Sequence, residues 1–251
     1  MKVQSLDRAF DILELLSREQ HGLALTEIGN RLDLHKSTVY RLLQALKQRG
    51  YIEKNAKGSY RLGMEFIELS SLYLNNLELK TEAQPILREL SSLSGNTAFL
   101  ATLQESEVVY IDKMETFNSL RKYSIIGQRA PLYCTALGKS MLTGKTEEQI
   151  RRLYRDRELT VFTEKSISSV DDLIEEIENT RRRGWSLDDE EYEEGLRCIG
   201  APIRDYRNEV IAAVSTSGYA SVITRERVEE IAAYVVKAAR DISQLMGYRS
   251  G

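Results

Sequence analysis

The stretch LHKSTVYRLLQALKQRG, residues 34–50, decides how the first part of this chain folds. Its apolar residues recur at the spacing of one face of an α-helix, at positions Val39, Leu42, Leu43 and Leu46. The opposite face carries hydroxyl, amide, aromatic and basic side chains and no acidic residue. A helix that only meets solvent usually mixes Glu with Lys and Arg, so this face is typical of a surface that binds something negatively charged.

Two shorter helices are predicted before this one. Residues 5–17 predict an amphipathic helix with Ser5 as its N-cap. Its inward side chains are expected to be Leu6, Ala9, Phe10, Leu13 and Leu16. Residues 25–33 predict a second helix, with Thr26 as its N-cap, that leads by a short turn into the third.

A β-hairpin is predicted after the third helix. Gly50 ends that helix, and the sequence YIEKNAKGSYRLG, residues 51–63, predicts two short strands around a turn at residues 55–58. Three helices followed by a hairpin is the order of a winged helix-turn-helix domain, which we expect over residues 1–63.

The third helix is then expected to lie in the major groove of double-stranded DNA. Arg41 can pair with guanine or a phosphate, and Gln44 can read adenine. The predicted DNA-binding residues are Lys36, Ser37, Thr38, Tyr40, Arg41 and Gln44 on the helix, with Lys57 and Arg61 on the wing. A winged helix that binds protein instead of DNA stays open as an alternative.

The charge distribution agrees with this hypothesis. The chain of 251 residues has a net charge of −3, yet residues 1–63 alone carry a net charge of +4. The remaining residues therefore carry −7, so that only the first part is suited to a polyanion.

Other sequence features narrow the class of protein. No apolar run approaches the roughly 20 residues that a membrane span needs, and the amphipathic, acid-containing N-terminus resembles neither a signal peptide nor a transit peptide. The two cysteines, Cys134 and Cys198, lie far apart without metal-ligand spacing. We therefore expect a cytoplasmic protein without a membrane anchor, a metal or a cofactor.

Residues 64–78 predict a helix that links two domains. Its apolar side chains, Phe66, Ile67, Leu69 and Tyr73, form a stripe that a single isolated helix cannot bury. We expect this stripe to pack on a second copy of the chain; packing within the same chain stays open.

Residues 79–251 predict a second domain that mixes helices and strands, and the fold class is therefore α+β with an antiparallel sheet. Pro85 is expected in the first turn of a helix that ends before Gly95. Strands are predicted at residues 96–104, 107–115, 120–126, 196–205 and 209–218, and helices at 135–142, 146–156, 170–183 and 224–246.

Several motifs closely resemble the IclR family of bacterial transcriptional regulators. They are VQSLDRAFDILELL, LTEIGNRLDLHKSTVYRLLQALKQRGYIEK and GSYRLG in the first domain, and APLYCTALGKSML, GWSLDDEEYEEGLRCIGAPIRD and AAVSTSGY in the second. The resemblance implies a winged-helix DNA-binding domain, a linker helix and a GAF/profilin-like effector domain with a six-stranded antiparallel sheet. It also implies homodimers or dimers of dimers, and small organic acids or sugar acids as effectors. The two-fold symmetry of a dimer would in turn match a palindromic operator.

The same resemblance implies an effector pocket at Ala136, Leu137, Asp188, Leu196, Cys198, Ser215 and Ser217. Taken on their own terms, residues 196 and 198 share one face of a strand, as do residues 215 and 217. Backbone N–H groups at the start of the 135–142 helix could hold a carboxylate, and an ionised Asp188 would accept hydrogen bonds from effector hydroxyls. Gly195 and Gly200 are expected to allow close approach of the backbone.

Each of these residues also has a structural interpretation. Cys198 is more often a small buried core residue than a reactive one, and the two serines could satisfy backbone groups at a strand end. The run DDEEYEEG is typical of a solvated loop, from which only Asp188 is assigned to the site.

A catalytic function fits the sequence less well. A Cys198 nucleophile needs a base beside it, yet the only histidines, His21 and His35, lie in the predicted winged helix. A zinc site at Cys134, Cys198 and Asp188 lacks ligand spacing. The sequence therefore predicts a transcriptional regulator without enzymatic activity, whose DNA binding responds to a small carboxylate. It favours a repressor over an activator.

Overall fold

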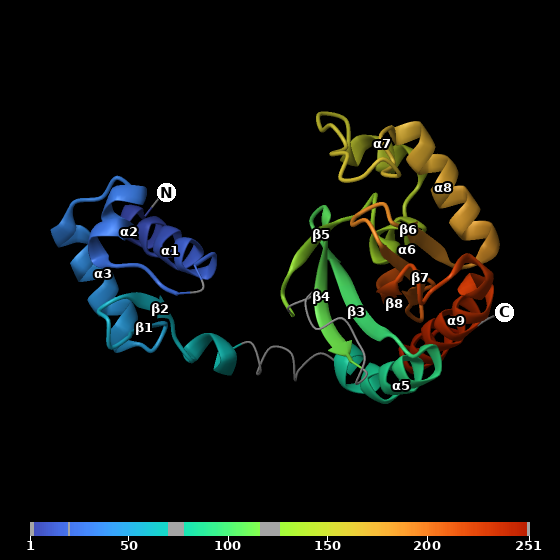
Figure 1. The fold of residues 1–251 in the computed structure, drawn as a ribbon, viewed down its shortest axis with the longest axis horizontal. Helices are drawn as coiled ribbons and strands as arrows, with labels where there is room; N and C mark the ends of the chain where they lie inside the picture. The colour runs from blue at the N-terminus through green and yellow to red at the C-terminus, as the bar shows by residue number, and fades with distance from the viewer. Residues whose placement is uncertain (1–2, 20, 70–77, 116–125, 250–251) are drawn as a thin grey trace. The chain divides into compact units, whose positions relative to one another are not determined.

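The computed structural model describes residues 3–19, 21–69, 78–115 and 126–249. The chain divides into two compact units, Met1–Asn76 and Leu77–Gly251 (Figure 1). The first unit comprises α1 (Gln4–Ser17), α2 (Leu25–Arg31), α3 (Lys36–Gln48), β1 (Ile52–Lys54) and β2 (Tyr60–Leu62). The two strands form an antiparallel hairpin, so the predicted winged helix-turn-helix order is confirmed.

The core of the first unit joins all three helices to the hairpin. Ile12 of α1, Ile28 of α2 and Val39 of α3 are fully buried, and Tyr60 of β2 packs in the same cluster. The predicted inward stripe of α3 is confirmed, because its four apolar residues all contribute to this core.

The start of α1 differs from the prediction. The helix begins after Val3, without a side-chain cap from Ser5. Leu6 and Phe10 are each 52% exposed, whereas Ile12 and Leu16 are buried. This helix has two apolar faces about a third of a turn apart, and the one through Ile12 and Leu16 packs in the core with α3 and the hairpin.

The cap of α2 also differs from the prediction. Ala24, not Thr26, occupies the N-cap position. The Glu27 carboxylate accepts a hydrogen bond of 2.7 Å from the backbone N–H of Ala24, which satisfies one of the donors at the helix start.

The second unit is built on a six-stranded sheet with the order β5-β4-β3-β8-β7-β6. Its strands are β3 (Thr97–Gln104), β4 (Glu107–Met114), β5 (Arg129–Pro131), β6 (Ser186–Asp189), β7 (Leu196–Arg204) and β8 (Val210–Tyr219). Every neighbouring pair is antiparallel, so the predicted α+β class and six-stranded sheet are confirmed. The strand predicted at residues 120–126 lies almost entirely outside the described residues.

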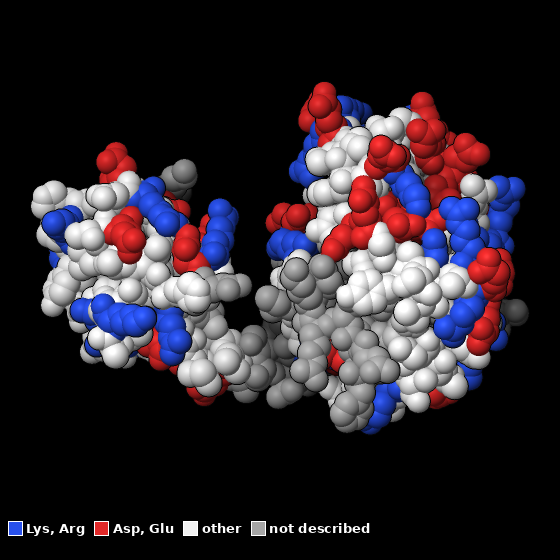
Figure 2. Space-filling model, in the orientation of Figure 1, with Lys and Arg blue, Asp and Glu red and all other residues white. Residues whose placement is uncertain are grey.

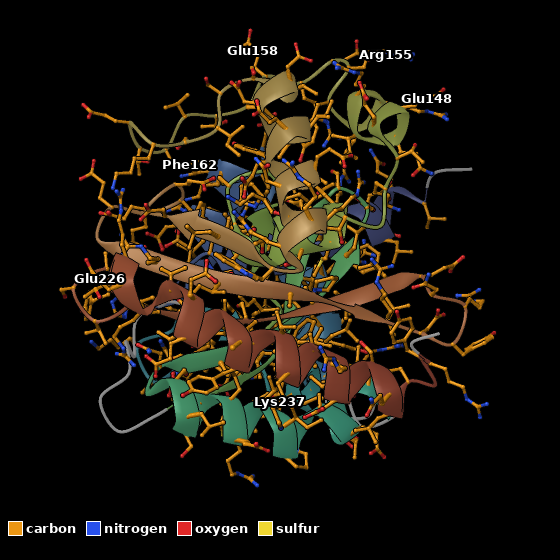
Figure 3. The ribbon with its side chains drawn as sticks, turned by 90° about the vertical axis from the view of Figure 1, so that its right-hand side faces the viewer. Glu148, Arg155, Glu158, Phe162, Glu226 and Lys237 are labelled. Carbon is orange, nitrogen blue, oxygen red and sulfur yellow. The ribbon has the colours of Figure 1, made fainter. Side chains whose placement is uncertain are left out.

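Helices cover both faces of this sheet. α5 (Glu78–Ser94) and α9 (Val228–Leu245) pack together on one face, with the short 3₁₀ helix η1 (Arg225–Arg227) before α9. α6 (Ala136–Leu142), α7 (Glu147–Leu153) and α8 (Val170–Arg183) lie on the other face. Figure 3 shows the layers from the side, with α9 and α5 below the sheet and α8 above it.

Pro85 lies inside α5 and not in its first turn. Leu79 and Ala83 are buried together with Leu87 and Leu90, so one apolar face continues on both sides of the proline. Packing of this face therefore extends the helix N-terminal to Pro85, although the proline supplies no N–H of its own.

The predicted linker helix is described only in part. Residues 65–69 are helical, and residues 70–77 lie outside the described residues. Met64, Ile67 and Leu69 are 69%, 55% and 43% exposed. In the described parts of the chain, no helix has both the length and the apolar character that crossing a membrane requires.

Candidate functional site

The outer face of α3 is the first candidate site. Lys36, Ser37, Tyr40, Arg41 and Gln44 are exposed on it, and Thr38 is half-buried. Tyr40 is 53% exposed, so its ring and hydroxyl are accessible on this face. Within the described part of the chain, neither Lys36 nor Arg41 forms an ion pair, so both cations are free to bind an anion.

The start of α3 is organised by a residue that the sequence analysis did not assign. His35 occupies the N-cap position, and its Nδ1 lies 2.9 Å from the Ser37 hydroxyl and accepts from the Ser37 backbone N–H at 3.5 Å. A histidine is an uncommon N-cap, so helix-capping preferences alone could not identify it.

The wing presents its two predicted cations differently. Lys57 is exposed in a turn where the Asn55 side chain accepts from the N–H groups of Lys57 and Ser59, each at 3.0 Å. Arg61 instead pairs with Glu53 at 2.5 Å across the hairpin. Lys57 is therefore the freer of the two to contact a phosphate.

The second candidate site is a cavity of about 160 Å³ in the second unit, on the face of the sheet covered by α6. All seven predicted effector-pocket residues line it: Ala136, Leu137, Asp188, Leu196, Cys198, Ser215 and Ser217. The sequence analysis missed six other lining residues, which are Phe99, Tyr110, Gln128, Thr135, Tyr192 and Glu193. Five of these six lie on β3, on β4 or in loops whose approach to the cavity depends on strand order.

The strand register brings the polar lining residues into one row. Asp188 of β6 is paired with Cys198 of β7, which is paired in turn with Ser217 of β8. Directly paired residues project from the same face of a sheet, so the three side chains are neighbours. The Cys198 thiol donates a hydrogen bond of 3.1 Å to the Ser217 hydroxyl.

The start of α6 forms the wall opposite this row. Thr135 is its N-cap, and the threonine hydroxyl accepts from the Gly138 N–H at 3.1 Å. The Ser186 hydroxyl donates to the Ala136 carbonyl at 2.6 Å, which ties α6 to β6. A Cβ atom on Gly200 would lie 2.8 Å from the same carbonyl oxygen.

The two glycines predicted to allow close approach of the backbone have different roles. Gly200 lets the start of α6 approach β7, so the prediction is confirmed there. Gly195 adopts a positive φ of 78° in the loop before β7, and an added Cβ would meet no atom within 4 Å. For Gly195 the prediction was wrong, because its backbone conformation and not a close contact favours glycine.

Asp188 has an unusual environment. It is only 4% exposed, and its Oδ1 accepts from the backbone N–H groups of Glu191 and Tyr192 at 2.8 and 3.4 Å. Burial raises the pKa of this carboxyl to about 7, although the Lys139 charge opposes the change. Near neutral pH Asp188 therefore exists in both forms, and its protonated form can donate a hydrogen bond as well as accept one.

A buried lysine lies behind this site. Lys139 of α6 is completely buried, pairs with Glu191 and lies 4.0 Å from Glu176 of α8. Burial raises the pKa of Glu191, and its Oε2 atom has no hydrogen-bond partner among the described residues. Figure 2 shows other acidic side chains gathered on the surface over the end of this unit that carries α7 and α8.

The run DDEEYEEG is therefore not a solvated loop. Its first two residues belong to β6, Glu191 is 9% exposed, and Tyr192 lines the cavity. The charge that draws Glu191 inward is Lys139, which lies 52 residues away in the sequence. No local pattern could have revealed this pair.

Two family models match the chain. Residues 71–244 match the C-terminal domain of the bacterial transcriptional regulator IclR, and residues 5–56 match the IclR helix-turn-helix domain. The chain belongs to the IclR family. Its two matched regions coincide with the two structural units, so the candidate surface on α3 and the cavity fall in different family domains.

Several bacterial transcriptional regulators are similar in sequence to this chain over nearly its whole length. The HTH-type transcriptional regulator KdgR of Escherichia coli K12 is 38% identical over 247 residues, which cover 98% of this chain and 94% of that protein. The transcriptional repressor IclR of the same organism is 35% identical, covering 98% of this chain and 91% of that protein. The crystal structure of Thermotoga maritima IclR has a TM-score of 0.84 and 31% identity, covering 98% of this chain and all of that one. This IclR-family chain is accordingly a DNA-binding transcriptional regulator.

The cysteines of this IclR-family chain are held as thiols. Burial raises the pKa of Cys198 and of Cys134, which disfavours the reactive thiolate. Across the described residues, no group of three His, Cys, Asp or Glu side chains is placed to hold a metal ion.

Proposed function

We propose that this chain is a repressor whose operator binding is controlled by a small carboxylate bound in the cavity of the second unit. The observation that carries the proposal is the convergence of Asp188, Cys198, Ser215 and Ser217 on one cavity. These side chains come from three neighbouring strands and offer hydrogen bonds to a polar ligand. A cavity with few, convergent polar groups is typical of a binding site for a small molecule.

The size of the cavity limits the ligand. A cavity of roughly 150 Å³ accommodates a benzene-sized molecule. The cavity of about 160 Å³ in this chain therefore suits a ligand of similar bulk, such as a hydroxy or keto acid with two to four carbons.

DNA binding is assigned to α3 and the wing. With α3 in the major groove, Arg41 and Gln44 lie on the exposed face that would meet base edges, and Lys57 is available for a phosphate. Arg61 is expected to contribute less, because it is paired with Glu53.

We further propose that the chain works as a homodimer or a dimer of dimers on a palindromic operator, with domains at residues 1–63 and 79–251 and a linker helix at 64–78. The support is the set of exposed apolar side chains in residues 3–10 and 64–69, which are Val3, Leu6, Phe10, Met64, Ile67 and Leu69. Light scattering at micromolar protein concentration measures the molecular mass, which should be that of two or of four chains.

The second unit is proposed to bind its ligand without transforming it. Cys198 has no histidine beside it, and His21 and His35 belong to the first unit. We also propose a cytoplasmic location, because a repressor must reach the chromosome.

The DNA-binding assignment is tested by capturing sheared DNA from the source genome and sequencing what is retained. The wild-type protein should enrich fragments that share a two-fold symmetric sequence. Arg41→Ala should lose this enrichment, because a lost base contact costs about 1–3 kcal/mol. Arg49→Ala is the matched control, since it removes the same charge from the other end of α3.

Equal enrichment of the same sequence by the Arg41→Ala variant would contradict the assignment of α3. Loss of enrichment in the Arg49→Ala variant as large as that in Arg41→Ala would also contradict it, because bulk charge would then explain the binding.

A further inference from the structure

Among its described lining residues, the cavity assigned to a carboxylate ligand presents no cationic side chain that could neutralise one. None of the described lining residues is Lys, Arg or His, whereas Asp188 and Glu193 are both acids. The nearest buried cation, Lys139, is already paired with Glu191 and close to Glu176. A ligand carboxylate beside an ionised Asp188 would place two like charges together in a buried site, which is strongly unfavourable.

We propose that the cavity takes up its carboxylate ligand together with one proton, which Asp188 holds and donates to the ligand in a hydrogen bond. This inference rests on the proposed function, because it assumes that the ligand is a carboxylate. The proton comes from solvent, and no covalent bond forms or breaks. A carboxylic acid and a carboxylate that share a proton form a strong hydrogen bond without a cation.

The geometry of Asp188 suits this role. Its Oδ1 is fixed by two backbone N–H groups, which leaves Oδ2 as the atom without a backbone donor. A proton on Oδ2 is therefore compatible with both existing hydrogen bonds. The burial of the side chain excludes the water that would otherwise stabilise the ionised form.

Charged and titratable groups approach Asp188 from each element around it. Lys139 of α6 favours the ionised form, whereas Glu191 in the loop after β6 disfavours it. Burial raises the pKa of Cys198 on β7, of Tyr110 on β4 and of Cys134 before α6, so these three groups are neutral near pH 7.

Three further neighbours complete the surroundings of Asp188. Burial raises the pKa of Tyr192 in the loop after β6, so its phenol stays neutral near pH 7. Glu193 lies in the same loop, and Glu176 faces Lys139 from α8. Asp188 lines the cavity and has a pKa of about 7, so its carboxyl can take up a proton from solvent on binding.

Proton uptake has a definite consequence for affinity. Below the pKa of the free Asp188 the carboxyl already holds its proton, so affinity is independent of pH. Above that pKa each further unit of pH lowers the fraction of protein with a protonated, binding-competent Asp188 about tenfold, and the affinity falls in proportion. The wild-type dissociation constant should therefore increase about 30-fold between pH 6 and pH 8.5.

Isothermal titration of the full-length protein tests this, with pyruvate and lactate as compact keto-acid and hydroxy-acid probes. Titrations in two buffers of different ionisation enthalpy measure the protons taken up per ligand bound. The expected uptake is about 0.1 at pH 6, about 0.5 at pH 7 and about 0.9 at pH 8. This measurement needs only the wild-type protein.

Two variants assign the proton to one residue. Asp188→Asn keeps an oxygen to accept the two backbone hydrogen bonds and places an NH₂ donor where the proton would be. It should bind the probes without proton uptake and with an affinity that does not change with pH. Glu193→Gln removes the other carboxylate of the same cavity and should keep the proton uptake of the wild type.

Binding of pyruvate or lactate with no proton uptake and with equal affinity at pH 6 and pH 8.5 would overturn the inference and leave the proposed carboxylate site intact. Persistence of the wild-type uptake in Asp188→Asn would also overturn it, since another group would then hold the proton. If neither the wild type nor the two variants bind either probe at pH 6, the carboxylate site itself is refuted, and this inference falls with it.

Discussion

Replacement of Asp188 by Asn should stabilise the second unit at pH 8 far more than at pH 5. The reason is the environment of this carboxyl, which is 4% exposed and whose pKa burial raises from 3.8 to about 7. Asn is nearly isosteric, keeps the acceptor for the two backbone N–H groups and has no ionised form. The variant therefore removes the titration and little else.

The sign follows from the higher pKa of Asp188 in the folded state. For a carboxyl whose pKa is raised on folding, the favourable contribution is complete below pH 3.8 and is lost as the pH rises through about 7. A tenfold change in the proton-binding constant corresponds to about 1.4 kcal/mol, so the wild type loses about 4 kcal/mol by pH 8 and about 2 kcal/mol by pH 5. Asp188→Asn escapes this loss, so its advantage in the free energy of unfolding should grow by about 2–3 kcal/mol between these two pH values.

Urea unfolding followed by tryptophan fluorescence measures this difference. The chain has one tryptophan, Trp185, which directly precedes β6 and so reports on the second unit. Comparison of the variant with the wild type at each pH cancels the contributions of the other carboxyl groups. An equal difference at pH 5 and pH 8, or a variant that is less stable at pH 8, would refute the view that a buried, neutral Asp188 is the favoured folded form.

Two further predictions concern the cavity and its wall. Combined Ser215→Ala and Ser217→Ala substitutions should weaken ligand binding by about 1–3 kcal/mol for each lost hydrogen bond, while the operator affinity without ligand stays the same. A gel shift with and without ligand measures both affinities. A ligand response equal to that of the wild type would place the binding site elsewhere. Gly200→Ala should destabilise the second unit by about 1–3 kcal/mol, because the added Cβ would lie 2.8 Å from the Ala136 carbonyl oxygen and force α6 outward. An unchanged urea midpoint of Trp185 fluorescence would show that α6 is not held as tightly as this distance implies.

The sequence predicts best where one local pattern determines the result. The apolar spacing in residues 34–50 and the turn after Lys54 predict α3 and the hairpin, because both depend on residues close in sequence. The pairing of β7 with β8 follows equally from two apolar runs separated by a short turn. Cys198 and Ser217 then meet by register alone, so two of the three residues in the row Asp188, Cys198 and Ser217 were predictable.

Prediction fails where tertiary packing chooses between local alternatives. The first helix has two apolar faces, and only the packed core shows that Ile12 and not Phe10 faces inward. Likewise, α5 continues past Pro85 because Leu79 and Ala83 are buried in the second unit. Local rules for capping and for proline contain no information about either partner surface.

The cavity shows why its chemistry is the hardest part to predict. A buried lysine and buried acids each contradict the rule that charges stay in water, and they are tolerated only when each charge is compensated. Lys139 compensates the charge of Glu191, and the backbone N–H of Glu191 donates a hydrogen bond to Asp188. Asp188 itself has no cation of its own among the described residues and resolves the conflict by changing its protonation. Asp188 destabilises the fold when it is ionised and also lines the cavity proposed to bind the ligand, so function and stability are expected to place different demands on this residue. The two experiments on Asp188, proton uptake on ligand binding and pH-dependent unfolding, therefore test the same proton independently.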